Sequence, residues 1–118
     1  MNTVTTSQRN YCAARAVYET ISAECRRHVD ARFGAGYLPG TDEETETYVE
    51  FEIDTERELG RLDALALMQA AEIALFNTCR AHVELSGAPA QAVNVLANPP
   101  RILHLRRKLV EICMSLRI

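Results

Sequence analysis

The chain has 118 residues, of which 47% are apolar and 25% are charged, and both values are ordinary for a globular protein. A chain of this length forms one domain, 1–118, that can bury a core without cross-links. No apolar run approaches the roughly 18 residues of a membrane span, and the first ten residues lack the apolar stretch of a signal peptide. We therefore expect a cytoplasmic protein whose four cysteines are reduced thiols.

The net charge of −3 is unevenly distributed along the chain. Residues 42–58 contain nine acidic residues against Arg57, which gives this segment a charge of −8. Residues 99–118 contain five basic residues against Glu111, which gives a charge of +4. Blocks of like charge indicate how a protein meets its partners, and they say little about its fold.

The first predicted helix covers about residues 7–33, after a disordered start at residues 1–6. Five residues spaced by three and four form a narrow stripe, which is typical of a helix that packs along one face in a bundle; they are Ala14, Tyr18, Ile21, Cys25 and His28. The sequence Gly34-Ala35-Gly36 predicts its end.

An extended acidic strand is predicted at about 47–54. Val49, Phe51 and Ile53 alternate there with acidic residues, and β-branched and aromatic residues favour a strand. Residues 91–96 are one candidate pairing partner for this strand. A short helix over 89–97, with Pro89 in its first turn, is the alternative for that segment.

The longest predicted helix covers about residues 56–86. Thr55 and Glu58 have the spacing of a capping box, and Gly87 is a suitable residue to end the helix. Gly60 weakens the prediction of its first turn. The middle of this segment is apolar on most sides, so we expect a buried central helix.

The last predicted helix covers about residues 99–117, with Asn98 as its N-cap and Pro99 in its first turn. Its apolar face is predicted at spacings of three and four residues, formed by Ile102, Leu105, Leu109, Ile112 and Leu116. The predicted fold class is therefore mainly α, a small bundle of three long helices with one acidic strand.

Two segments share the pattern Cys-Arg-x-His-Val-acid, at Cys25/His28 and at Cys79/His82. A cysteine and a histidine three residues apart share one helix face, and two such pairs make a ligand set that zinc accepts. Buried cysteines and histidines near helix ends are also common without a metal. We therefore predict no metal and no cofactor, and a zinc-stabilised helical protein is kept as an alternative.

The sequence contains no phosphate-binding glycine loop, zinc-protease motif or nucleophile elbow, so we predict no catalytic residues and no enzyme. The predicted function is a protein-interaction module, an adaptor or inhibitor, that binds a basic partner surface through segment 42–58. A nucleic-acid mimic, such as a phage or mobile-element antagonist, is one version. The predicted partner-binding residues are Asp42, Glu43, Glu44, Glu46, Glu50, Glu52 and Asp54. The alternative is a solvated strand face that prevents aggregation.

A nucleic-acid-binding protein is the other alternative, with the basic C-terminal helix as its binding surface. That helix carries Arg101, His104 and the run Arg106-Arg107-Lys108. The acidic balance of the chain and the lack of aromatic residues after Leu96 argue against this function, because bases stack on aromatic side chains. We expect no membrane partner, and the sequence leaves a homodimer open.

Overall fold

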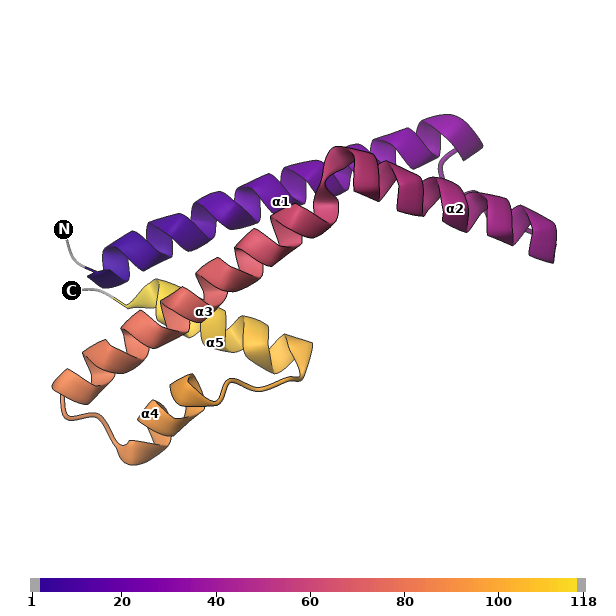
Figure 1. Cartoon of the computed structure of the whole chain (residues 1–118). Coiled ribbons are helices and arrows are strands. Elements are labelled where there is room, and N and C mark those ends of the chain that lie inside the picture. Colours follow the sequence, from indigo (N-terminus) through magenta and orange to yellow (C-terminus); the bar gives the residue numbers. More distant parts are fainter. Residues whose placement is uncertain (1–2, 117–118) are drawn as a thin grey trace. The chain divides into compact units, whose positions relative to one another are not determined.

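The computed structural model describes residues 3–116 and contains five helices in that range (Figure 1). Their bounds are α1 Thr3–Phe33, α2 Asp42–Leu59, α3 Arg61–Leu85, α4 Ala90–Ala97 and α5 Leu103–Ser115. No strand occurs among the described residues, so the mainly α class is confirmed. The predicted acidic strand at 47–54 is wrong, since these residues lie inside α2.

The alternating pattern of residues 47–54 has a helical explanation. Tyr48, Phe51 and Thr55, spaced by three and four residues, lie on the inner side of α2. Val49 and Ile53 are four residues apart and lie on the outer side, 42% and 48% exposed. Three apolar residues at alternate positions therefore belong to two different faces of one helix, a pattern too short to separate period 2 from period 3.6.

Helix α2 begins at a capping motif that the sequence analysis did not select. The Thr41 hydroxyl accepts a hydrogen bond from the Glu44 N–H at 3.1 Å, and the Glu44 carboxylate accepts one from the Gly40 N–H at 3.0 Å. Thr55, the predicted cap, is a buried residue in the interior of α2. Both threonines precede a glutamate by three residues, so the motif alone does not decide between them.

The predicted helix 56–86 is divided at Gly60. This residue has φ 73° and ψ 31°, a left-handed conformation that ends α2, and its N–H donates to the Arg57 carbonyl at 3.3 Å. The Gly60 carbonyl then accepts from the Ala64 N–H at 3.0 Å and starts α3. Glycine adopts this conformation without the cost that a side chain would add.

Helix α1 begins earlier than predicted, at Thr3. Val4 is 2% exposed and belongs to a hydrophobic core, so the predicted disorder of residues 1–6 is wrong for residues 3–6. Residues 1–2 lie outside the described range. The predicted end at Phe33 is confirmed, and Gly34 follows with φ 97°.

The chain divides into two compact units, of which the first comprises Met1–Ala14 and Met68–Ile118. Its buried core is formed by Val4, Tyr11, Leu75, Phe76, Cys79, Leu96, Leu109, Val110 and Cys113. The Gln8 side chain donates to the Cys113 and Leu116 carbonyls at 2.8 and 3.1 Å, which satisfies acceptors at the C-terminal end of α5.

Segment 89–97 adopts the helical alternative, α4, and the last helix is shorter than predicted. Asn98 closes α4, with its N–H donating to the Asn94 carbonyl at 2.9 Å, and is therefore not the N-cap of the last helix. Helix α5 starts at Leu103 and buries Leu109, Val110 and Cys113. Of the predicted apolar face, three residues are instead exposed: Ile102, Leu105 and Ile112, at 58%, 40% and 60%.

The second unit comprises Arg15–Leu67 and holds α2 against the C-terminal part of α1 (Figure 1). Phe33 lies within 5.1 to 5.4 Å, between ring centres, of three other aromatic rings: Tyr37, Tyr48 and Phe51. At the far end of α2, the Arg61 guanidinium donates to the Tyr18 hydroxyl at 2.6 Å and to the Ser22 hydroxyl at 3.2 Å. These contacts at both ends of α2 set the two helices antiparallel.

Candidate functional site

The predicted partner-binding residues lie on a helix, and the structure arranges them differently from a strand. Glu46, Glu50 and Asp54 are exposed at intervals of four residues. Asp42 and Glu58 continue the same interval at the two ends of the helix. The five carboxylates therefore form one row that winds about 160° around α2, because four residues turn about 40° more than a full turn. We call Asp42, Glu46, Glu50, Asp54 and Glu58 the acidic row.

The other predicted residues have more local positions. Glu43 and Glu44 occupy the first turn together with Asp42 of the acidic row, where the helix dipole favours negative charge. The Glu44 carboxylate is also engaged by the Gly40 N–H. Glu52 is half-buried, on the side of α2 opposite Glu50 and Asp54. The residues predicted to bind a partner therefore include exposed members of the acidic row and residues that stabilise the start of α2.

Few of the acids in α2 have a basic partner. Asp54 pairs with Arg57 at 3.2 Å and Glu56 pairs with Arg61 at 3.5 Å. Within the described part of the chain, no ion pair involves Asp42, Glu46, Glu50 or Glu58. Like charges four residues apart on a helix destabilise it by about 0.2–0.5 kcal/mol per pair. The acidic row thus carries a repulsion that the chain itself hardly neutralises.

Two exposed apolar residues lie beside the acidic row. Val49 and Ile53 are four residues apart, so their side chains are neighbours on the outer side of α2. Together with the acidic row they form a surface that we call the α2 face. The strand prediction placed both residues on one side together with Phe51, although their spacing of four also indicates a shared helix face.

The inner side of α2 is firmly held. Tyr48 accepts a hydrogen bond from Arg26 at 3.1 Å, and Arg26 also pairs with Asp30 at 2.9 Å. The Tyr48 ring lies 5.5 Å from that of Tyr37, and Phe51 packs edge-on against Phe33. Aromatic pairs of this kind stabilise beyond the area that they bury. The α2 face is consequently presented by a helix whose orientation on α1 is fixed.

The basic C-terminal helix presents fewer cations than its sequence suggests. The Arg106 guanidinium forms an ion pair with Glu72 of α3 and lies 5.6 Å from the ring centre of Phe76. Arg106 is therefore held at the edge of the first unit's core, half-buried. Arg101, His104, Arg107 and Lys108 are exposed.

The proposed zinc ligands divide between the two units. Cys25 and His28 belong to the second unit, whereas Cys79 and His82 belong to the first. Among residues 3–116, no group of three or more histidine, cysteine or acidic side chains is placed to hold a metal ion. His28 is exposed, 3.4 Å from a carboxylate oxygen of Glu24.

Three of the four cysteines are buried thiols. Cys79 and Cys113 belong to the core of the first unit, where a hydrogen bond to Cys79 and burial together raise the pKa of Cys113 far above its usual range. Burial also raises the pKa of Cys25. Because the thiolate is the reactive form, Cys25 and Cys113 are poorly suited to nucleophilic chemistry. The hydrogen bond with Cys113 lowers the pKa of Cys79, whose side chain is fully buried in the core. Cys12 is the exposed cysteine.

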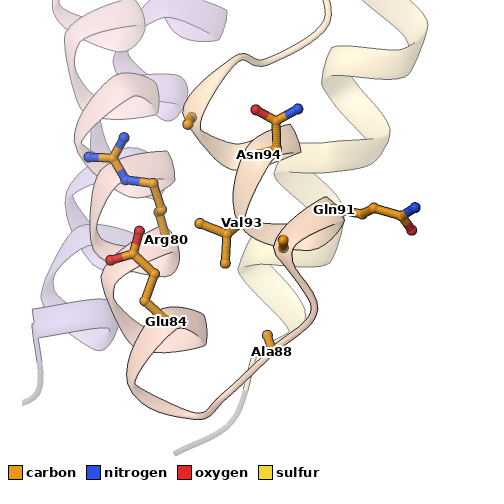
Figure 2. Close-up of a pocket in the computed structure, with 8 residues that line it drawn as sticks. Arg80, Glu84, Ala88, Gln91, Val93 and Asn94 are labelled. Atoms are coloured by element: carbon orange, nitrogen blue, oxygen red, sulfur yellow. The ribbon is translucent and has the colours of Figure 1, made fainter.

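A shallow depression of ≈ 760 Å³ lies between the end of α3 and α4 (Figure 2). Arg80 and Glu84 of α3 form one wall, and Val93 of α4 points toward them. The remaining lining residues are small or polar: Ala88, Ala90, Gln91, Asn94 and Ala97. The lining contains no histidine, cysteine or hydroxyl group, so it offers no thiol or hydroxyl nucleophile and no imidazole.

No helix in residues 3–116 is long and apolar enough to cross a membrane. Comparisons of the chain with protein-family models, with curated protein sequences and with solved structures found no match. The α2 face is accordingly the strongest candidate site, on its own geometry and charge.

Proposed function

We propose that the chain is a non-enzymatic protein-interaction module, an adaptor or inhibitor, whose α2 face binds a basic surface on another protein. One observation carries this proposal. The acidic row is exposed and largely without basic partners, and it lies beside the exposed pair Val49 and Ile53.

The combination of charge and apolar surface is the reason to favour binding over simple solvation. A solvated helix face has no need for exposed Val and Ile side chains, and a purely apolar face would not select a partner. Apolar residues surrounded by charges are typical of interfaces, where the apolar contacts supply affinity and the charges supply selectivity and fast association. A partner with basic residues around an apolar groove fits both features.

A nucleic-acid mimic remains one form of this proposal, with helical spacing in place of strand spacing. Four residues of an α-helix advance about 6 Å along its axis. Successive phosphates of one DNA strand advance about 3.4 Å, so the acidic row matches roughly every second phosphate. The partner would then be a protein whose basic groove normally holds nucleic acid.

The test uses the full chain as bait for proteins from the cells in which it is expressed. The row variant carries Glu46→Gln, Glu50→Gln and Asp54→Asn, which remove charge and keep shape. The control carries Asp63→Asn, Glu84→Gln and Glu111→Gln, three exposed acids outside α2. Both variants carry the same net charge, so a difference between them reports position.

We expect the wild-type bait and the control to retain a basic protein that the row variant loses, as quantified by mass spectrometry. The purified partner should then bind the wild-type chain with an affinity that falls as salt is raised. Equal recovery with all three baits would contradict the proposal, as would recovery of nothing above background.

A further inference from the structure

The first unit has an exposed apolar surface of its own, on α5. Leu105 and Ile112 are seven residues apart on the solvent side of the helix, and Ile102 precedes it. A stripe with this spacing is what a helix presents to a partner helix. The stripe lies away from the buried side of α5, which is formed by Leu109, Val110 and Cys113.

Basic residues accompany this stripe. Lys108 lies between Leu105 and Ile112, at intervals of three and four residues, and His104 is one position before Leu105. Arg101 is four residues before Leu105. No ion pair involves Arg101, His104 or Lys108 in the part of the chain that the structure describes. We call Arg101, Ile102, His104, Leu105, Lys108 and Ile112 the α5 face.

The α2 face and the α5 face are complementary. The first offers Val49 and Ile53 beside unpaired carboxylates, and the second offers Leu105 and Ile112 beside unpaired bases. Exposed residues recur at spacings of four, three and four on both helices. These positions are 42, 46, 49 and 53 on α2, and 101, 105, 108 and 112 along α5 and its approach.

Like-with-like pairing is disfavoured. Two copies of the α2 face would set carboxylates against carboxylates, and two copies of the α5 face would set bases against bases, and like charges across an interface cost energy. Each face is exposed within its own unit. A second copy supplies the complement to each, and a two-fold axis would use both pairs at once.

We propose that the α2 face of one molecule docks onto the α5 face of a second copy of the chain. This inference rests on the proposed function, because it names a basic partner surface for the α2 face. The apolar residues of the two helices would interdigitate, with carboxylates of the acidic row facing Lys108 and Arg101. Reciprocal docking gives a symmetric homodimer.

The first measurement is the mass of the full chain in solution, by light scattering after size exclusion, across concentration and salt. We expect a dimer at low salt whose dissociation constant rises at least tenfold as salt increases from about 0.05 to 0.5 M, because the paired charges are exposed and screened. A chain that stays monomeric at several hundred micromolar and low salt would overturn the inference.

A charge exchange then tests which faces meet. The acid-to-base variant carries Glu46→Lys, Glu50→Lys and Asp54→Lys, and the base-to-acid variant carries Arg101→Glu, His104→Glu and Lys108→Glu. We expect each variant alone to be monomeric and their equimolar mixture to form a heterodimer. Persistence of dimers in either variant alone, or a mixture that remains monomeric, would overturn the pairing.

Two further variants guard against trivial loss of folding. Leu105→Gln with Ile112→Gln changes only exposed apolar side chains, and we expect it to retain the helical circular dichroism of the wild type and to weaken the dimer at least tenfold. Asp63→Lys with Glu84→Lys changes charge outside both faces and should leave the dimer intact. Dimers unaffected by the double glutamine change would count against the α5 face.

The inference and the proposed function fail in different ways. If the chain is monomeric and the α2 bait still captures a basic protein through the acidic row, the second copy is excluded and the proposed function stands. If self-association is restored by the charge exchange and no other protein is captured, the second copy is the partner. If neutralising the acidic row changes neither the capture of other proteins nor the self-association of the chain, the proposed function and the inference are both wrong.

Discussion

The carboxylate of Glu72 in α3 accepts a hydrogen bond from Nε of Arg106 in α5, at the edge of the first unit's core. The Glu72 side chain is 11% exposed and that of Arg106 28%, and the guanidinium covers the ring of Phe76. This pair links two helices that are more than thirty residues apart in the sequence.

Glu72→Ala should lower the free energy of unfolding by about 2–4 kcal/mol, because it leaves the Arg106 charge largely buried without its partner. Equilibrium unfolding in urea measures the loss. Glu84→Ala removes an exposed acid from the same helix and should change stability by less than about 0.5 kcal/mol. Similar losses for both variants would show that the Glu72–Arg106 pair does not contribute to stability beyond an ordinary exposed acid.

Gly60→Ala should lower the free energy of unfolding by about 1–2 kcal/mol, because a side chain there must adopt a left-handed backbone. No atom outside the immediate chain lies within 4 Å of the added Cβ, so the loss is conformational. If residues 56–86 formed one continuous helix, as the sequence predicted, alanine would instead stabilise the protein by about 1 kcal/mol. The sign of the change, by urea unfolding, decides between the two. Gly40→Ala is the control, since Gly40 has no positive φ.

Thr41→Ala should cost about 1 kcal/mol, since the hydroxyl that accepts the Glu44 N–H at the start of α2 is lost. Thr47→Ala makes the same chemical change inside the helix, where the hydroxyl only donates to the Glu43 carbonyl. We expect no loss there, because alanine is the better helix former. Thermal unfolding followed by circular dichroism compares the two, and equal losses would rule out the capping function.

Glu50→Gln should raise stability by about 0.4–1 kcal/mol at low salt, because Glu50 lies four residues from both Glu46 and Asp54 and its charge repels both. The gain should disappear in about 1 M salt, where such interactions are screened. Glu56→Gln is the matched control: Glu56 pairs with Arg61, so the same change should not stabilise. Equal changes for Glu50→Gln and Glu56→Gln at low salt would contradict repulsion within the acidic row.

Stability should fall as the pH rises above the ordinary thiol pKa of about 8.5, in part because of Cys25. Burial raises the pKa of Cys25 in the folded chain, helped by the nearby Glu56 charge. The unfolded chain therefore loses its thiol proton first and is favoured through this pH range. The decrease between pH 8 and 10.5, measured by urea unfolding, should be smaller in Cys25→Ala. A decrease in Cys25→Ala as large as in the wild type would contradict the contribution of this thiol.

The sequence predicted those parts of the fold that depend on local signals. The end of α1 follows from Gly34, and the end of α3 falls two residues before Gly87, because glycine adopts positive φ without penalty. The start of α2 was missed because a threonine and a glutamate at the capping spacing occur at both Thr41 and Thr55. Only the tertiary contacts of Tyr48 and Phe51 show which one is used.

The candidate site was predicted by charge and missed by geometry. Segment 42–58 is acidic in any conformation, so the number of its charged residues was enough to select it as the candidate site. The acidic row and the exposure of Val49 and Ile53 follow from the helical conformation of this segment. Neither was predicted, because the alternation of three apolar residues indicated a strand. Helix α5 shows the same difficulty of choosing the buried face from a short apolar pattern. Most of its predicted apolar face is exposed, because Val110 and Cys113 are buried in the core instead.

The ring cluster around Phe33 makes the second unit optically distinct. The chain contains no tryptophan, and three of its four tyrosines, Tyr18, Tyr37 and Tyr48, fall within Arg15–Leu67. Near-ultraviolet dichroism and tyrosine emission will therefore report chiefly on the neighbourhood of α2, whereas far-ultraviolet dichroism averages over every helix. Melting curves recorded at the two wavelengths compare the local order of the α2 face with that of the whole chain, without a label or a mutation.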